Sequence, residues 1–182
     1  IQVLDLSNTN ISNLPEDFFW GFYSLQILNL SGNQIQNIHP NTFARLQYLT
    51  FLDLTKTSLS TEILATSMSS NQSLEELNVE NNAILNIDTS RLNYPSLEVL
   101  NVRFNSIWRL KSDLLNHVPN LKSLNNIPYF GVVSNDMFQG FPNLTHLSIS
   151  HNEIRVIEAN SFTGLPSLTT LDISNNRLRF IN

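Results

Sequence analysis

The sequence lacks several features that mark other classes of protein. It has no cysteine, so it can form no disulfide bond. Charged residues make up only 14% of its 182 residues and the net charge is −5, which argues against the basic surface of non-specific nucleic-acid binding. No apolar run approaches the roughly 18 residues that a membrane-spanning helix needs. We therefore expect neither nucleic acid as the first-choice partner nor a membrane-spanning segment.

Motifs that carry enzyme chemistry are missing as well. There is no nucleophile–base motif, no glycine-rich phosphate loop and no pair of carboxylates in a pocket-like context. The histidines show no spacing typical of metal ligands. We expect a binding protein that is not an enzyme and needs no cofactor or metal.

What the sequence does contain is one pattern repeated along almost its whole length. The clearest copy begins at Leu144 and reads L-x-x-L-x-I-x-x-N-x-I-x-x-I, followed by a segment with Phe162 and Leu165. One such unit cannot bury its own apolar face, but stacked copies can, so we expect a single repeat array over 1–182. The first apolar residues of the eight units are Ile1, Leu25, Leu49, Leu74, Leu97, Leu121, Leu144 and Leu168.

Within each unit, the residue types predict a short strand and then a turn back into the core. Counted from the first apolar residue, positions 3 to 8 alternate between inward and outward with period two. Positions 4 and 6 point inward, while positions 3, 5, 7 and 8 can face solvent. Every connection returns the same way, so successive strands should be parallel. The expected fold is an α/β-type solenoid, with a curved parallel sheet on the concave face and turns and short helices on the convex face.

Position 9 carries asparagine or threonine in seven of the eight units. At the end of the strand the chain turns inward and leaves backbone groups unpaired. An asparagine amide has two donors and an acceptor, so stacked copies can satisfy these groups as a ladder. The residues are Asn33, Asn82, Asn105, Asn152 and Asn176, with Thr9 and Thr57 as substitutes.

This pattern resembles the leucine-rich repeat, in the longer phenylalanine-containing class typical of animal extracellular proteins. The second half of the unit is carried by the segments 19–22, 43–46, 138–141 and 162–165, and no plant-type Gly-x-Ile-Pro signature is present. The resemblance implies a non-catalytic protein-recognition module: the ligand-binding segment of an extracellular receptor, similar to Toll-like receptor ectodomains, or of an insect innate-immune protein. Its partner would be a protein ligand or a receptor chain, in a homodimer or heterodimer. The alternative is a structural or adhesion protein of the matrix or synapse, Slit-like or proteoglycan-like.

Extracellular repeats of this class are usually closed by disulfide-bonded caps. Here Ile1 already occupies position 1, Asn182 falls midway through the eighth unit, and there are no cysteines. An open end exposes the core of a repeat array. We therefore expect an internal piece of a longer protein, which on its own should self-associate.

The outward positions of the strands give the candidate binding residues. Val3, Ile27 and Phe51 share position 3 of the first three units and should form an exposed apolar stripe. Such a stripe either stabilises the sheet through mutual shielding or marks a protein interface, and we favour the interface. The candidate ligand-binding residues on the concave face are Val3, Ile27, Phe51, Asp53, Glu76, Glu80, Val99, Arg103, Phe104, His146 and His151.

Two of these residues suggest a further property of the face. His146 and His151 fall on the concave side of one unit, with Asp172 on the neighbouring strand. Histidine titrates near neutral pH, so the pair is consistent with a pH-sensitive patch. Ordinary solvated polar residues on a sheet face are the commoner explanation.

The third unit departs from the pattern in its second half. It is one residue longer, and Glu62 to Met68 are predicted to form a short helix on the convex side. Asn71 stands where other units have Phe or Leu. We expect this substitution to open the core position to solvent.

The sixth unit departs more strongly. It has Asn126 at position 6, Pro128 at position 8 and Tyr129 at position 9, and proline cannot donate a hydrogen bond to a sheet. We expect 125–134 to lack a regular strand and to loop out, with Pro128, Tyr129 and Phe130 as a possible functional loop. Drift in a tolerant surface turn explains the departure equally well.

Four tripeptides fit the N-glycosylation pattern. Asn10, Asn71 and Asn143 lie in predicted turns and are the candidate glycan carriers. Asn29 falls inside a strand on the concave face, where a glycan would obstruct that face. It is therefore the least suitable of the four.

Overall fold

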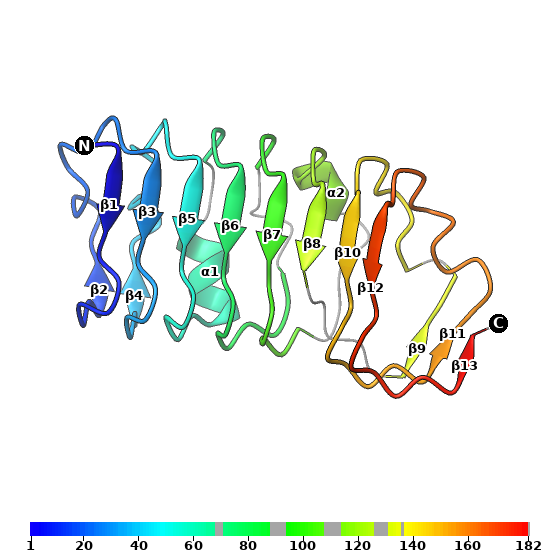
Figure 1. Ribbon diagram of the computed structural model, residues 1–182. Helices are drawn as coiled ribbons and strands as arrows, with labels where there is room; N and C mark the ends of the chain where they lie inside the picture. Colours follow the sequence, from blue (N-terminus) through cyan, green and yellow to red (C-terminus); the bar gives the residue numbers. More distant parts are fainter. Residues whose placement is uncertain (68–70, 88–93, 108–113, 126–130, 136, 182) are drawn as a thin grey trace.

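The computed structural model of the protein describes residues 1–67, 71–87, 94–107, 114–125, 131–135 and 137–181. Its main element is a parallel sheet of eight strands that follow one another in chain order (Figure 1). Each strand is three residues long and occupies positions 3 to 5 of its unit, which confirms the predicted solenoid. The strands are β1 (Val3–Asp5), β3 (Ile27–Asn29), β5 (Phe51–Asp53), β6 (Glu76–Asn78), β7 (Val99–Asn101), β8 (Ser123–Asn125), β10 (His146–Ser148) and β12 (Thr170–Asp172).

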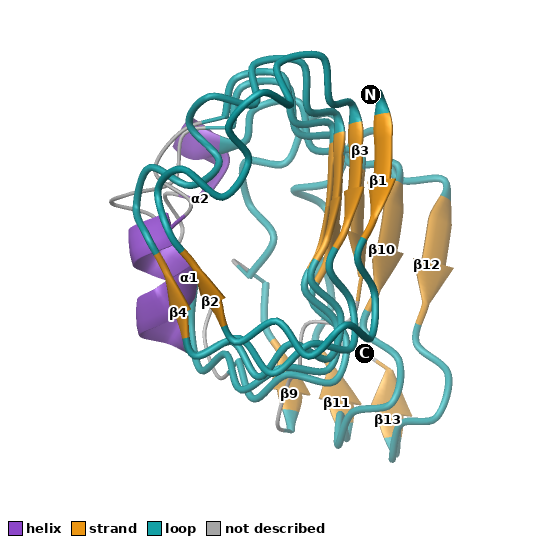
Figure 2. Cartoon of the chain, turned by 90° about the vertical axis from the view of Figure 1, so that its left-hand side faces the viewer, coloured by secondary structure: helices purple, strands orange, loops and turns teal. Residues whose placement is uncertain are grey.

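Shorter parallel strands line the return path of the units. They form one pair and one three-stranded sheet with the order β13-β11-β9. The pair is β2 (Asn13–Leu14) with β4 (Asn37–Ile38), and the three strands are β9 (Val132–Val133), β11 (Val156–Ile157) and β13 (Phe180–Ile181). Figure 2 looks along the stack and shows β2 and β4 across the coil from the large sheet.

Two helices lie on the side of the coil opposite the large sheet (Figure 2). They are α1 (Thr61–Ser67) and α2 (Leu114–His117). The predicted helix in the third unit is confirmed as α1, although Met68 lies outside the described residues. In the part of the chain that the structure describes, no helix is both long and apolar enough to cross a membrane.

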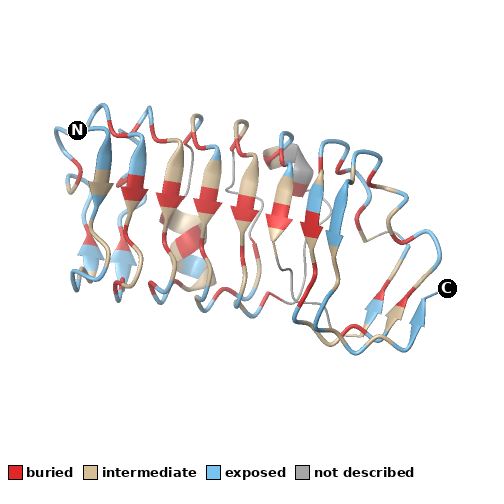
Figure 3. Cartoon of the chain, in the orientation of Figure 1, coloured by how far each residue is buried: buried red, intermediate tan, exposed pale blue. Residues whose placement is uncertain are grey.

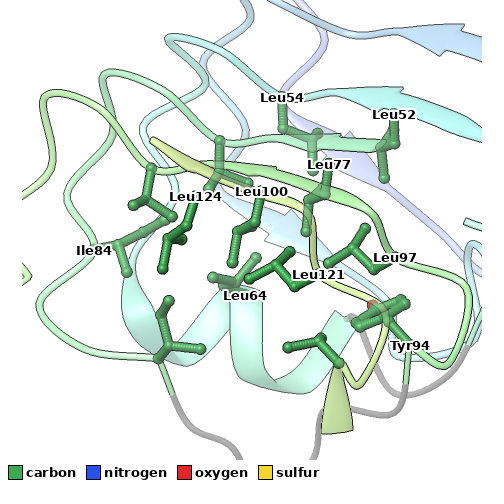
Figure 4. Packing of buried hydrophobic residues seen from close by; sticks show 14 of the residues in the cluster. Leu52, Leu54, Leu64, Leu77, Ile84, Tyr94, Leu97, Leu100, Leu121 and Leu124 are labelled. Atoms are coloured by element: carbon green, nitrogen blue, oxygen red, sulfur yellow. The ribbon is translucent and has the colours of Figure 1, made fainter. Parts of the chain in front are cut away.

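The inward residues of the strands fill one core. In the large sheet, the middle residue of each strand from β3 to β10 is buried, as Figure 3 shows, and these leucines are in register from strand to strand. Figure 4 shows Leu77, Leu100 and Leu124 clustered with Leu64 of α1 and Tyr94. Full burial of one such aliphatic side chain contributes about 1.5–3 kcal/mol. The predicted assignment of inward and outward positions is therefore confirmed.

The asparagine ladder is present with the predicted roles. Asn33 Nδ2 donates to the carbonyls of Leu30 at 2.7 Å and of Leu6 in the preceding unit at 2.9 Å. Its Oδ1 accepts from the N–H of Ile11 at 2.9 Å. The amide thus joins two units through backbone groups that the turn leaves unpaired. The same set of bonds recurs at Asn82, Asn105 and Asn176.

The turn after each strand has two features that the repeat pattern did not reveal. In six units an Asp or Asn side chain at position 5 accepts a hydrogen bond from the N–H two residues on; for example, Asp53 Oδ1 accepts from Thr55 N at 2.8 Å. At position 8, every described residue has a positive φ, between 52° and 71°. These residues are Asn8, Gly32, Lys56, Asn81, Phe104, His151 and Asn175.

The expectation that Asn71 opens the core to solvent is wrong. Its side chain is only 8% exposed, and Nδ2 donates to the carbonyl of Leu46 in the preceding unit at 2.9 Å. Its Oδ1 accepts from the N–H of Ser73 at 3.1 Å. The amide can replace an apolar side chain here because both of its ends find backbone partners.

The expectation for the sixth unit is wrong where the structure describes it. Asn125 is the last residue of β8, in register with β7 and β10, and Val132–Val133 form β9 within the segment that we expected to be irregular. Asn126 at position 6 lies outside the described residues, so the expected irregularity at that position stays a prediction. Pro128, Tyr129 and Phe130 lie outside the described residues, so the functional loop stays a prediction.

Candidate binding face

The outward residues of the large sheet form one surface, which we call the open face. It carries positions 3, 5 and 7 of the units, with position 8 at its edge. At its N-terminal end, Val3 pairs with Ile27 and Ile27 with Phe51 in the strand register. Val3 is 60% exposed, Ile27 is 39% exposed and Phe51 is half-buried. The three predicted residues thus form a continuous apolar stripe.

The middle of the open face is acidic and partly committed to the fold. Glu76 and Val99 continue the position 3 column after Phe51 and are both half-buried. Glu80 Oε2 accepts from Asn101 Nδ2 at 3.0 Å. The carboxylate of Asp53 already accepts a hydrogen bond from Thr55 N in the turn after its strand, so only part of its hydrogen-bonding capacity remains for a ligand.

The C-terminal half of the open face contains a hollow of about 380 Å³. It crosses the four strands from β7 to β12, and its lining includes Arg103, His146, His151 and Asp172. Serines and asparagines make up five of the seven other residues that line it. The structure therefore brings together three predicted residues with one, Asp172, that was outside the predicted set.

Asp172 carries a carboxylate that stays ionised far into the acid range. The side chain and N–H of Ser174 hydrogen-bond to it, with smaller contributions from Ser150 and Ser148, and these bonds lower its pKa to about 2. The N–H of Ser174 lies 3.0 Å from Oδ1, and Ser148 Oγ lies 3.3 Å from Oδ2. Hydrogen bonds favour the charged form of a carboxylate. Asp172 therefore supplies a fixed negative charge at one end of the hollow.

Arg103, Phe104 and His151 form a cluster at the other end, which we call the Phe104 corner. The Arg103 guanidinium lies 5.1 Å from the centre of the Phe104 ring, a cation–π distance. The His151 ring lies 6.5 Å from the same ring, although it belongs to a unit two further along. Phe104 is nevertheless 53% exposed. Arg103 Nε is buried and has no hydrogen-bond partner among the residues that the structure describes.

Both histidines lie within hydrogen-bonding distance of an uncharged side chain. His151 Nε2 lies 3.2 Å from Asn175 Nδ2, and His146 Nδ1 lies 2.8 Å from Thr145 Oγ1. Within the described ranges, neither histidine pairs with a carboxylate, and no group of His, Asp and Glu could hold a metal ion. The pH-sensitive patch stays a hypothesis.

Glycosylation is expected at Asn10 and Asn143 but not at Asn71 when the chain is made in a secretory pathway. Nδ2 is the atom that a glycan would join, and it donates to a backbone carbonyl in both Asn71 and Asn143. The difference is burial: Asn10 and Asn143 are exposed, whereas Asn71 is only 8% exposed and its bond to Leu46 is buried. Glycopeptide mass spectrometry measures the occupancy of each site. High glycan occupancy at Asn71 would show that its side chain is accessible before this turn has folded.

The fold and the open face define a leucine-rich repeat solenoid. Residues 1–59 and 129–178 match the leucine rich repeat family, so the chain belongs to that family. Its relatives include Tsukushi from Gallus gallus, with 30% identity over 159 residues that cover 85% of this chain and 42% of that protein. Toll-like receptor 4 from Bos taurus is 43% identical over 60 residues, which are 32% of this chain and 7% of the receptor. The chain thus spans less than half of either relative.

Among solved structures, the fold is similar to that of Toll in its complex with Spatzle, described as a hub in Drosophila development and innate immunity. The TM-score is 0.77 and the identity 24%, over 97% of this chain and 24% of Toll. The predicted resemblance to Toll-like receptor ectodomains is confirmed. Proteins of this family and fold are typically non-enzymatic protein-binding modules.

Proposed function

We propose that the chain is a non-catalytic recognition module that binds a protein with the open face of its large sheet. The observation that carries this proposal is the apolar stripe of Val3, Ile27 and Phe51, held in register and left in solvent. Exposed apolar patches with polar surroundings mark protein interfaces. The polar neighbours here are Asp5, Asn29 and Asp53, which share the same strands.

The similarity to Toll-like receptor 4 and to Toll supports a place in an extracellular receptor or innate-immune protein. The partner is then a protein ligand or a second receptor chain. Toll itself was solved with Spatzle bound, which supports a ligand-binding role for this family member. The exposed sequons at Asn10 and Asn143 are compatible with passage through a secretory pathway.

The proposal is tested by placing a photo-crosslinking residue at position 27 or, as a matched control, at Gln47. Gln47 is exposed and belongs to the return path of its unit, away from the open face. Each variant is irradiated in extracellular fluid, and the crosslinked proteins are identified by mass spectrometry. We expect a specific product at position 27 that disappears when Val3→Asp and Phe51→Asp are added, and that is absent at Gln47.

The partner identified in this way is then purified for affinity measurements. Ile27→Asp should weaken its binding about tenfold or more, as is usual for a central interface residue. Identical products at positions 27 and 47, or products that survive both charged substitutions, would overturn the proposal.

A further inference from the structure

Phe104 has an unfavourable backbone conformation for its residue type. Its φ is 52°, in the left-handed region that glycine and asparagine tolerate and bulky side chains avoid. The turn imposes this conformation on position 8 of every described unit. Four of the seven described residues at that position are the tolerant types: Asn8, Gly32, Asn81 and Asn175.

Burial does not compensate for the strain at Phe104. More than half of Phe104 is in solvent, and within the described part of the chain its ring contacts are the Arg103 guanidinium and the His151 ring at the edge of the open face. Strained residues that are not explained by packing are concentrated at functional sites. An exposed aromatic beside an arginine has the composition of a binding hot spot.

The hollow beside Phe104 has opposite charges at its two ends. Arg103 lies at the β7 end and forms no ion pair with any residue that the structure describes. Asp172 lies at the β12 end and is held as a carboxylate by its serine neighbours. The sheet order β7-β8-β10-β12 separates the two by three strand spacings, roughly 14 Å across the strands. The hydroxyls of Ser123, Ser148 and Ser150 line the path between them.

We propose that the Phe104 corner and the hollow bind an extended segment of a protein partner that crosses β7 to β12. An acidic side chain of the segment pairs with Arg103, a neighbouring apolar side chain covers Phe104, and a basic side chain pairs with Asp172. Extended chains advance about 3.3 Å per residue, so the acidic and basic residues are about four positions apart. This inference rests on the proposed function, because it describes how the same face recognises its partner.

The first test uses short synthetic peptides that contain one Asp beside one Leu, and one Lys at different distances along the peptide. Their affinities for the full chain are measured by fluorescence anisotropy. We expect the highest affinity at a separation of about four residues, and a loss of about tenfold when the peptide's Asp or Lys is replaced by Ala.

Double-mutant cycles assign each charge to its partner. The protein variants are Arg103→Gln and Asp172→Asn, and the second keeps an acceptor for the N–H of Ser174. Arg103→Gln should make affinity insensitive to the peptide's Asp while leaving its dependence on Lys. Asp172→Asn should do the reverse. The proposal would be overturned if affinity did not depend on the spacing between Asp and Lys, or if all peptides that contain Asp lost affinity equally. It would also be overturned if no peptide bound at millimolar concentration.

The second test separates function from stability at Phe104. Phe104→Asn should raise the melting temperature, because asparagine accepts the left-handed conformation, and should lower peptide affinity about tenfold. Lys56→Asn is the matched control, since Lys56 has a φ of 54° at the same position of the third unit and lies outside the hollow. It should raise the melting temperature and leave affinity unchanged. A lower melting temperature or an unchanged affinity for Phe104→Asn would overturn the role of Phe104.

The two proposals fail in distinguishable ways. If the crosslink at position 27 depends on the apolar stripe but the charge cycles show no coupling, recognition by the open face stands and the segment across the hollow does not. If the cycles show coupling and the crosslink is absent, the binding region is confined to β7 to β12 and the stripe is not part of it.

Discussion

Asn105→Ala should lower the free energy of unfolding by about 1–3 kcal/mol, since it leaves buried backbone groups without partners. Asn105 Nδ2 donates to the carbonyls of Val79 at 2.8 Å and Val102 at 3.0 Å, and its Oδ1 accepts from Ile84 N at 3.1 Å. These groups belong to the turns of two adjacent units, so the substitution also weakens the interface between the units. Urea denaturation followed by circular dichroism gives the change from the shift in midpoint.

Asn101→Ala is the matched control on the open face. Asn101 Oδ1 accepts from Arg103 N at 3.2 Å and its Nδ2 donates to Glu80 at 3.0 Å, but water can reach these groups once the amide is gone. We expect a loss of roughly 0.5–1 kcal/mol. Equal effects at Asn101 and Asn105 would contradict the difference between the open face and the ladder.

The regular part of the fold could be predicted because the same sequence pattern recurs in successive units. A strand of three residues is too short to identify alone, but Leu28, Leu52 and Leu77 recur at the same place in successive units and are all buried. Stacking enforces the common register, since a unit out of register would expose its own apolar residues and those of its neighbours. The ladder followed from the same repetition of a residue whose hydrogen-bonding groups match the turn.

The local departures could not be predicted because the stack overrides local preference. Lys56, Phe104 and His151 take a positive φ that their residue types disfavour, and only comparison with Gly32 in the same column points to it. The predicted strand was also too long, because positions 6 to 8 were assigned to it, whereas the described strands of the large sheet end at position 5. Composition alone does not give the point at which a strand ends.

The candidate site could be predicted only where its residues share one position of the repeat. The apolar stripe depends on one column, so Val3, Ile27 and Phe51 could be grouped from their position number alone. The hollow depends on side chains from four units, and its two charges, Arg103 and Asp172, stand at different positions of their units. Reach and direction of the side chains decide whether such residues share a site, and the repeat pattern does not contain that information.

Gly164→Ala is expected to lower the free energy of unfolding by about 2–3 kcal/mol, a typical cost of forcing an extra methyl group into packed surroundings. A methyl group at Gly164 would lie 2.6 Å from the carbonyl oxygen of Phe138 and 2.8 Å from Cα of Gln139. Both are backbone atoms of the preceding unit, so no side chain can turn aside to make room. The two turns would have to separate, which would also pull apart the Phe138 and Phe162 rings, now stacked with centroids 5.8 Å apart.

Gly21→Ala separates this steric effect from the conformational cost of losing glycine. Gly21 occupies the same place in the first unit, has a φ of 88° and has nothing within 4 Å of the added methyl group. Its replacement should cost about 1–2 kcal/mol through backbone strain alone. At Gly164 the backbone is not in the left-handed region, so alanine would by itself stabilise the fold by about 0.4–1 kcal/mol through the unfolded chain. Any net loss there must come from the collision, and thermal melts of both variants measure it. A neutral or stabilising Gly164→Ala would show that the turns of the seventh and sixth units are not in backbone contact.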